Sequence, residues 1–163
     1  MKEKTTILLE RQDFHFSAGH YTIFSATERE KLHGHNFSVS VAIHTVLNDS
    51  GISFDYDIYK KTIRQLCKEL SQHMLLPAHS PYQTIEEEGD YYYCHYNNER
   101  IPFLKSDVKI LPLRNITVEE LARWFILKLT EDNAALEQYK IEGFTVTVNT
   151  APGQGGSMTW RKP

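Results

Sequence analysis

Residues 16–20 read Phe-Ser-Ala-Gly-His, and residues 33–37 read His-Gly-His-Asn-Phe. Both segments belong to longer stretches in which apolar and polar residues alternate, as they do in a β-strand with one buried face. The alternation predicts strands over about residues 5–21 and 32–46. In both strands the histidines of these two segments share the parity of the apolar residues, so we expect their side chains to point toward the interior.

The spacing of the histidines suggests a metal site. His33 and His35 point to the same face of a strand, and Gly34 between them leaves room for both imidazoles to meet one ion. His20 ends the preceding strand on its inward parity, so pairing of the two strands would bring a third imidazole to the same point. Three neutral imidazoles leave the fourth position of a zinc ion open, which is typical of a catalytic site. Packed core histidines without a metal remain the alternative on spacing alone.

The composition predicts one globular domain over residues 1–163. A chain of 19.0 kDa with 40% hydrophobic residues can build a sizeable core without a disulfide framework. The formal net charge of −3 disfavours nucleic acid as a partner. No segment approaches the ~18 consecutive apolar residues that would span a membrane. Cys67 and Cys94 form no CxxC pair and the N-terminus does not resemble a signal peptide, so we expect a cytoplasmic protein.

Two helices are predicted outside the first pair of strands. Apolar residues recur at helical spacing over about residues 55–72, which indicates an amphipathic helix. Thr117 and Glu120 form a capping box, which predicts that a second helix begins there and continues to about Thr130.

Three further β segments are predicted in the second half of the chain. Residues 90–96 and 101–104 are rich in strand formers and flank a plausible turn at Asn97-Asn98, so they predict a protruding hairpin. Strands are also expected over residues 144–149 and 158–160.

The two histidine segments resemble the signature of the 6-pyruvoyl-tetrahydropterin synthase family, which includes the 6-carboxytetrahydropterin synthases. The resemblance extends through Phe54-Asp55-Tyr56 and Thr117-Val118-Glu119, so it covers most of the chain in consistent order. It implies an α+β tunnelling fold, or T-fold: an antiparallel four-stranded sheet with two helices on one face, here with an inserted hairpin. It also implies a homo-oligomer, commonly a hexamer that is a dimer of trimers.

The resemblance assigns metal ligation to His20, His33 and His35, and the metal to zinc. The usual catalytic base of the family is a cysteine a few residues before the HxH motif, whereas this chain has Glu30 there. That replacement resembles a subgroup associated with shortening the side chain of a dihydroneopterin derivative to 6-hydroxymethyl-dihydropterin. Without the resemblance, the interpretation that the sequence favours for Glu30 is an exposed loop carboxylate.

Other family positions are altered. His73 occupies the position of a proton-relay histidine of the family. The residue before it is glutamine, whereas most family members have aspartate there. Without the resemblance, His73 would be interpreted as a solvated residue at a helix C-terminus. Asn149 and Thr150 occupy the place of a Glu-Thr pair whose glutamate meets the pterin ring. An amide cannot supply the charge-assisted double contact of a carboxylate. The resemblance also places Thr117 and Glu119 near the ring pocket, although both suit the first turn of a helix.

The resemblance therefore implies a zinc-dependent lyase that acts on dihydroneopterin or its triphosphate. The product would be 6-hydroxymethyl-dihydropterin or a tetrahydropterin of the 6-pyruvoyl or 6-carboxy type. Glu30 would take a proton from the substrate, and the zinc ion would polarise a substrate oxygen. The altered relay and ring positions leave an alternative open, a zinc-containing family member that binds a different ligand without pterin turnover. No nucleic-acid or membrane partner is expected.

Overall fold

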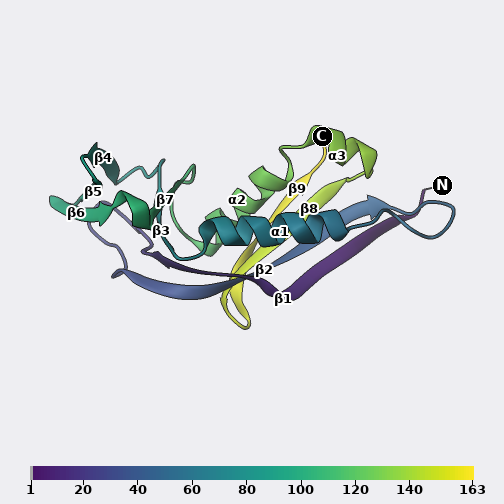
Figure 1. Ribbon diagram of the computed structural model, residues 1–163, viewed down its shortest axis with the longest axis horizontal. Helices are drawn as coiled ribbons and strands as arrows, with labels where there is room; N and C mark the ends of the chain where they lie inside the picture. Colours follow the sequence, from purple (N-terminus) through teal and green to yellow (C-terminus); the bar gives the residue numbers. More distant parts are fainter. Residues whose placement is uncertain (1) are drawn as a thin grey trace.

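The computed structural model describes residues 2–163, and Figure 1 shows how its helices and strands follow one another. In chain order the elements are β1 (Lys4–His20), β2 (His33–Val46), α1 (Asp57–Leu70), β3 (His73–Pro77), β4 (Thr84–Glu88), β5 (Tyr91–Tyr96), β6 (Glu99–Leu104), the 3₁₀ helix η1 (Lys105–Asp107), β7 (Val108–Leu111), α2 (Val118–Leu129), α3 (Asn133–Gln138), β8 (Gly143–Ala151) and β9 (Gln154–Arg161).

The main sheet within residues 2–163 has six strands in the spatial order β7-β3-β1-β2-β8-β9. β1, β2, β8 and β9 pair antiparallel, whereas β3 runs parallel to both β1 and β7. The expectation of a four-stranded antiparallel sheet is therefore wrong in detail, because β3 and β7 extend that sheet. These two strands have only five and four residues, too few to show the alternation by which a strand is recognised in a sequence.

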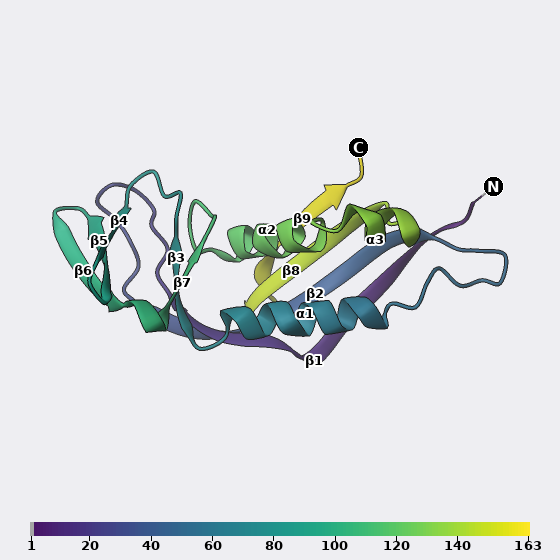
Figure 2. The ribbon, with the colours of Figure 1, turned by 45° about the horizontal axis from the view of Figure 1, so that its top comes forward.

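The predicted hairpin is part of a second, three-stranded sheet in the order β4-β5-β6. β5 and β6 pair around Asn97 and Asn98, whose φ angles of 47° and 61° are typical of a tight hairpin turn. β4 was missed because its three consecutive glutamates, at residues 86–88, resemble a solvated loop. In Figures 1 and 2 this sheet lies at one end of the molecule, and the N-terminus lies at the other.

Two long helices cover one face of the main sheet, as the family resemblance implied. α1 lies over β1, and α2 lies over β8 and β9 (Figure 2). The short helix α3 follows α2 and was not predicted. α1 buries five side chains at helical spacing: Tyr59, Ile63, Leu66, Cys67 and Leu70.

Aromatic side chains fill the core between the helices and the sheet. The ring of Phe16 lies 5.0 Å from that of Phe37 and 6.1 Å from that of Phe125, measured between centroids. Phe37 in turn lies 5.6 Å from the imidazole of His20 and 5.3 Å from that of His35. The predicted inward parity of β1 and β2 is confirmed, and it places these imidazoles at one end of a packed aromatic core.

One half of the predicted capping box forms. The Thr117 hydroxyl oxygen accepts a hydrogen bond from the Glu120 N–H at 3.2 Å and caps α2. The Glu120 carboxylate does not return to Thr117. It accepts hydrogen bonds from the backbone N–H of Arg114 at 2.9 Å, from Nη2 of Arg114 at 2.8 Å and from Nε of Arg123 at 2.9 Å. Hydrogen bonds between charged groups are stronger than neutral ones, so the Glu120 carboxylate binds the two arginines in place of the Thr117 N–H.

Replacing Glu120 by glutamine should make the fold less stable. Burial by itself raises the pKa of Glu120, but the hydrogen bonds from Arg114 and Arg123 lower it to about 2. Since the folded pKa lies below the ordinary value of 4.5, the carboxylate stabilises the fold above that pH and loses its contribution as the pH falls toward 2. We expect Glu120→Gln to lower the free energy of unfolding at pH 7 by about 2–3 kcal/mol.

Denaturant titrations of both proteins at several pH values check this expectation. The difference between Glu120→Gln and the parent should shrink as the pH falls below about 4.5. Glu131→Gln is the control, because Glu131 is an exposed partner of Lys128 at 3.4 Å and should change stability by no more than about 0.5 kcal/mol. A Glu120→Gln protein as stable as this control at neutral pH would contradict the assignment.

Two further observations concern the rest of the chain. Cys67 and Cys94 are buried and free. Within residues 2–163, none of the helices combines the length and the apolar character needed to cross a membrane.

Candidate functional site

The structure brings together the imidazoles of His20, His33 and His35. His20 lies directly opposite His33 in the antiparallel pairing of β1 and β2. Candidate ligand nitrogens of the three residues lie within 4.8 Å of one another, and Nε2 of His33 is 3.0 Å from Nε2 of His35. Nitrogens around one tetrahedral zinc ion at ~2.0–2.1 Å would be about 3.3 Å apart. The cluster is therefore close to the size that one ion requires.

Backbone carbonyls fix the orientation of two imidazoles. Nδ1 of His20 donates to the Ile116 carbonyl at 2.8 Å, and Nδ1 of His33 donates to the Lys31 carbonyl at 2.7 Å. Because a carbonyl only accepts, each ring keeps its proton on Nδ1 and turns the lone pair of Nε2 toward the cluster. Nε2 of His20 is buried and has no hydrogen-bond partner among the described residues. A metal ion would satisfy this atom.

Electrostatics favour the ligating form of His20. Burial, the largest effect, lowers the pKa of His20, and the neighbouring His33 and His35 lower it further. The hydrogen bond to the Ile116 carbonyl acts in the opposite direction but does not reverse the shift. The neutral imidazole, which is the form that binds metals, therefore predominates at neutral pH.

Glu30 lies beside the imidazole cluster, in the loop between β1 and β2. Its Oε2 is 3.8 Å from Nε2 of His33, and its Oε1 accepts a hydrogen bond from the Thr22 N–H at 2.9 Å. The Glu30 N–H donates to the Thr22 carbonyl at 2.8 Å. Burial raises the pKa of Glu30, but the Thr22 hydrogen bonds and the nearby imidazoles lower it more. The carboxylate is therefore ionised at neutral pH and able to accept a proton.

His73 is the first residue of β3 and not the end of a helix, because α1 already ends at Leu70. The alternative of a solvated helix C-terminus is therefore wrong. Gln72 makes the turn into β3 with a φ of 63°, and its N–H donates to the Ser17 carbonyl at 2.6 Å. His73 lines a groove of about 600 Å³ together with His35, and its Nδ1 is buried without a hydrogen-bond partner among residues 2–163.

Thr117 and Glu119 lie at the start of α2, close to the segment that holds His20. Thr117 directly follows Ile116, whose carbonyl accepts the hydrogen bond from Nδ1 of His20. Both residues line a cavity of about 350 Å³. A Cβ atom at Gly156 would lie 3.1 Å from Cγ of Glu119, so this glycine lets β9 approach the start of α2.

Asn149 and Thr150 are not brought to the imidazoles of their own chain. Asn149 pairs with the exposed Ser38 of β2, so its side chain lies on the face of the sheet opposite to that of His35. Its amide oxygen packs so closely on Gly155 that a Cβ atom there would be 2.1 Å away. The Thr150 hydroxyl donates to the carbonyl of Gln154 at 3.4 Å, within the β8–β9 hairpin.

Several groups that hold this site were not predicted. Asn115 pairs with the backbone of Ile23: its Oδ1 accepts from the Ile23 N–H at 3.1 Å and its Nδ2 donates to the Ile23 carbonyl at 2.8 Å. The other such groups are backbone atoms of Thr22, Lys31 and Ile116. A backbone group carries no residue-type signal, so only the side chain of Asn115, between Arg114 and Ile116, could have drawn attention.

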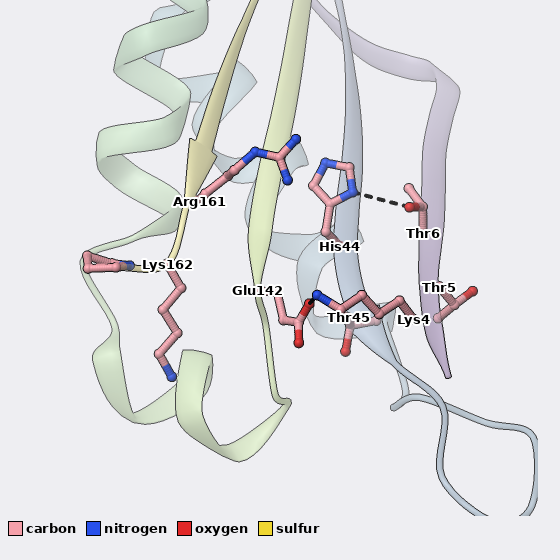
Figure 3. A pocket seen from close by; sticks show the side chains of 9 residues that line it. Lys4, Thr5, Thr6, His44, Thr45, Glu142, Arg161 and Lys162 are labelled. Atoms are coloured by element: carbon pink, nitrogen blue, oxygen red, sulfur yellow. Dashed lines mark hydrogen bonds and ion pairs between the residues drawn. The ribbon is translucent and has the colours of Figure 1, made fainter. Parts of the chain in front are cut away.

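A cavity of about 820 Å³, larger than the two described above, is lined by residues from the start of β1 and the end of β2 (Figure 3). It surrounds His44 near the other end of β2, on the order of 35 Å from His33 at ~3.3 Å per residue. Nδ1 of His44 and Oγ1 of Thr6 are 3.2 Å apart, and Nζ of Lys4 is 3.0 Å from a carboxylate oxygen of Glu142. Cavity volume therefore does not single out the imidazole cluster, which is distinguished by its three candidate ligand nitrogens.

A family model described as 6-pyruvoyl tetrahydropterin synthase matches residues 9–158. The chain belongs to this family. A family member from Methanocaldococcus jannaschii, named putative 6-carboxy-5,6,7,8-tetrahydropterin synthase, is 27% identical over 154 residues, which cover 91% of this chain and 94% of the relative. A protein of the same name from Pyrococcus horikoshii is 27% identical over 103 residues, covering 63% of this chain and 60% of the relative.

Solved structures of the family share the fold. The crystal structure of Plasmodium vivax 6-pyruvoyltetrahydropterin synthase matches with a TM-score of 0.91 and 28% identity, covering 98% of this chain and 99% of the other. That protein has also been solved with a glutamate, described as a catalytic residue, replaced by alanine. The Plasmodium falciparum protein matches with a TM-score of 0.91 and 24% identity, with the same coverage. The expected T-fold is confirmed, with the six-stranded sheet described above.

Proposed function

We propose that this protein is a zinc-dependent lyase that acts on dihydroneopterin or dihydroneopterin triphosphate, with Glu30 as the base. The observation that carries the proposal is the position of the Glu30 carboxylate, 3.8 Å from Nε2 of His33 within the cluster of three imidazoles. An ionised carboxylate at this distance is within reach of a substrate held at the same cluster.

The donor set supports zinc as the ion. His20, His33 and His35 offer three neutral nitrogen ligands, a set found in catalytic zinc sites, where a fourth position is left for substrate or water. The buried and unpartnered Nε2 of His20 fits this assignment. A zinc ion held there would supply Lewis acidity toward a substrate oxygen.

The residues of the chain would divide the proton transfers between them. For the carbon–carbon cleavage, Glu30 takes the proton of the hydroxyl on the second side-chain carbon, that fragment leaves as an aldehyde, and the carbon left on the ring takes up a proton. For the carbon–oxygen cleavage, Glu30 takes a proton from the neighbouring carbon, and the triphosphate leaves with the electron pair of the broken bond. His73 lines the same groove as His35 and is proposed as the second proton-transfer group. Its Nδ1 is buried and has no hydrogen-bond partner among the described residues, so no carboxylate fixes the tautomer of this ring.

Binding of the pterin ring is proposed to involve Thr117, Glu119, Asn149 and Thr150. Because Asn149 lies on the opposite face of the sheet from the imidazoles, one chain does not complete a pocket that contains both. We therefore propose a homo-oligomer, a hexamer made of two trimers, in which a second copy supplies the ring-binding side chains. The edge strands β7 and β9 offer unpaired backbone groups to such neighbours.

Of the two proposed products, the residues favour 6-hydroxymethyl-dihydropterin over a tetrahydropterin of the 6-pyruvoyl or 6-carboxy type. The support is chemical: the loop offers a carboxylate and no cysteine, and the Plasmodium vivax relative also has a glutamate described as catalytic. A second candidate function rests on Asn149. Without a carboxylate at this position, the protein could hold a zinc ion and bind a different ligand without pterin turnover.

Incubation of the zinc-loaded protein with each substrate tests these alternatives. We expect dihydroneopterin or its triphosphate to lose part of its side chain and give a product with the mass of 6-hydroxymethyl-dihydropterin, identified by chromatography and mass spectrometry. Absence of turnover with both substrates, together with a non-pterin ligand that copurifies, would favour the second candidate. A monomer in light-scattering measurements would contradict the proposed assembly.

A further inference from the structure

Arg29, the residue before Glu30, contacts the chain segment next to β1 as well as the three-stranded sheet. Its guanidinium carbon lies 4.9 Å from the ring centroid of Tyr21 and 6.0 Å from that of Tyr96. Nη1 donates to the carbonyl of Glu30 at 2.9 Å, and Nη2 is 3.5 Å from a carboxylate oxygen of Glu99. One side chain therefore links the Glu30 peptide to the end of β1 and to the second sheet.

The two rings that flank Arg29 are themselves fixed. Tyr21 and Tyr96 are 2% and 3% exposed. The Tyr96 hydroxyl donates to the Ser25 carbonyl in the loop at 2.8 Å, and the Tyr21 hydroxyl donates to Oε1 of the buried Gln83 at 2.7 Å. Gln83 directly precedes β4, so each ring ties the loop region to the three-stranded sheet.

A separate core joins this sheet to the loop. It is distinct from the core under the helices and consists of Tyr21, Ile23, Met74, Leu76, Cys94 and Tyr96. Members of this cluster come from the loop and its start, from β3 and from β5. Through this cluster, the inserted sheet packs against the segment that carries Glu30.

These contacts converge on the backbone of Glu30. Arg29 holds its carbonyl, while the Glu30 N–H donates to the Thr22 carbonyl at 2.8 Å. With both polar groups of the residue engaged, the carboxylate is held at its distance from His33. Misplacement of a catalytic group by about 1 Å can lower a rate by ~10²-fold, so loss of these hydrogen bonds should lower the rate measurably.

We propose that the sheet formed by β4, β5 and β6 positions the Glu30 loop, and that Arg29 is the positioning residue through which it acts. The inference rests on the proposed function of Glu30 as the base. Cation–π contacts with two buried rings, an ion pair with Glu99 and a charge-assisted hydrogen bond to the Glu30 carbonyl give Arg29 this role.

Arg29→Met and Arg100→Met form a matched pair of variants. Arg100 lies on β6 of the same sheet, 3.5 Å from the ring centroid of Tyr93 and 2.7 Å from a carboxylate oxygen of Glu88, but neither partner belongs to the loop. We expect Arg29→Met to lower kcat about 10- to 100-fold with KM changed less than about threefold. Arg100→Met should keep kcat within about twofold of the parent. Equal losses in both variants, or an unchanged kcat in Arg29→Met, would overturn the proposal.

A readout independent of turnover separates this inference from the proposed function. Hydrogen exchange of a peptide covering residues 21–32 should be at least about fivefold faster in Arg29→Met than in Arg100→Met, while the zinc content of both equals that of the parent. Should the protein lack pterin turnover, faster exchange would still support positioning of the loop by Arg29. Equal exchange rates would refute it.

Three milder variants keep the test open if Arg29→Met does not fold. Tyr96→Phe removes only the hydroxyl that donates to Ser25, and Glu99→Gln removes only the charge that pairs with Arg29. Each should speed exchange of the loop and lower kcat by a smaller factor, about two- to tenfold. Arg29→Lys keeps the cation but loses the planar fork, so its kcat should lie between those of the parent and Arg29→Met. Parent-like behaviour of all three would refute the proposal.

Discussion

A His33→Ala protein should purify without stoichiometric zinc and show no turnover above background. Nε2 of His33 is 3.0 Å from Nε2 of His35, so its removal takes away one of three ligands and leaves too few to hold a catalytic ion. Loss of an outer-shell partner of a metal ligand already costs roughly 10–100-fold in affinity, and loss of the ligand itself should cost more. Elemental analysis after dialysis measures the effect, and His20→Ala and His35→Ala should behave alike.

Stability provides a second measure of the same prediction. A ligand present at 100 times its Kd stabilises a folded protein by about 2.7 kcal/mol, so added zinc should raise the Tm of the parent protein. It should leave the Tm of His33→Ala unchanged. This readout does not depend on knowing the substrate.

His15→Ala is the control for the histidine variants. His15 lies on β1 with the outward parity, is exposed, and its Nδ1 bonds to the Gln12 carbonyl at 2.8 Å. It should keep the zinc content and the turnover of the parent. Stoichiometric zinc in both His20→Ala and His33→Ala would remove the metal assignment, and the reaction proposed above would have to be abandoned with it.

Glu30→Gln should lose turnover by about 10²- to 10⁴-fold while keeping its zinc. Glutamine has the shape of glutamate, and its amide oxygen can still accept the hydrogen bond that Thr22 donates at 2.9 Å. It has no basic site for a proton, so the effect isolates the chemistry from the geometry. Rates with saturating substrate, compared at equal zinc content, measure it.

Glu28→Gln serves as the control for Glu30→Gln. Glu28 lies in the same loop, where its carbonyl accepts hydrogen bonds from the N–H groups of Phe24 and Ser25, and this substitution does not alter those backbone contacts. It should retain the kcat of the parent within about twofold. If Glu30→Gln turns over substrate as fast as Glu28→Gln, another group is the base.

Much of the site could be predicted because it depends on local periodicity. Alternation alone predicted that His20, His33 and His35 share the buried face of two strands, and strand pairing then brings them together. The helix predicted over about residues 55–72, observed as α1 (Asp57–Leu70), rests on the same kind of signal. The signals are strong because β1 and β2 are long, with seventeen and fourteen residues.

The short elements could not be predicted by the same means. β3 and β7 have five and four residues, and they join the sheet through parallel pairing with strands that are distant in the chain. Parallel pairing depends on where the intervening helix or loop packs, which a local pattern does not record. β4 carries consecutive glutamates and is formed by pairing with β5.

The sequence by itself determined which side chains share a face, because the period of a strand is a property of neighbouring residues. Only the tertiary structure decided what lies opposite them: the Ile116 carbonyl that orients His20, the two rings that hold Arg29, and the separation of Asn149 from the imidazoles by the sheet itself. The first of these relations joins residues 96 positions apart, and all three depend on how the helices and sheets pack and not on local propensity.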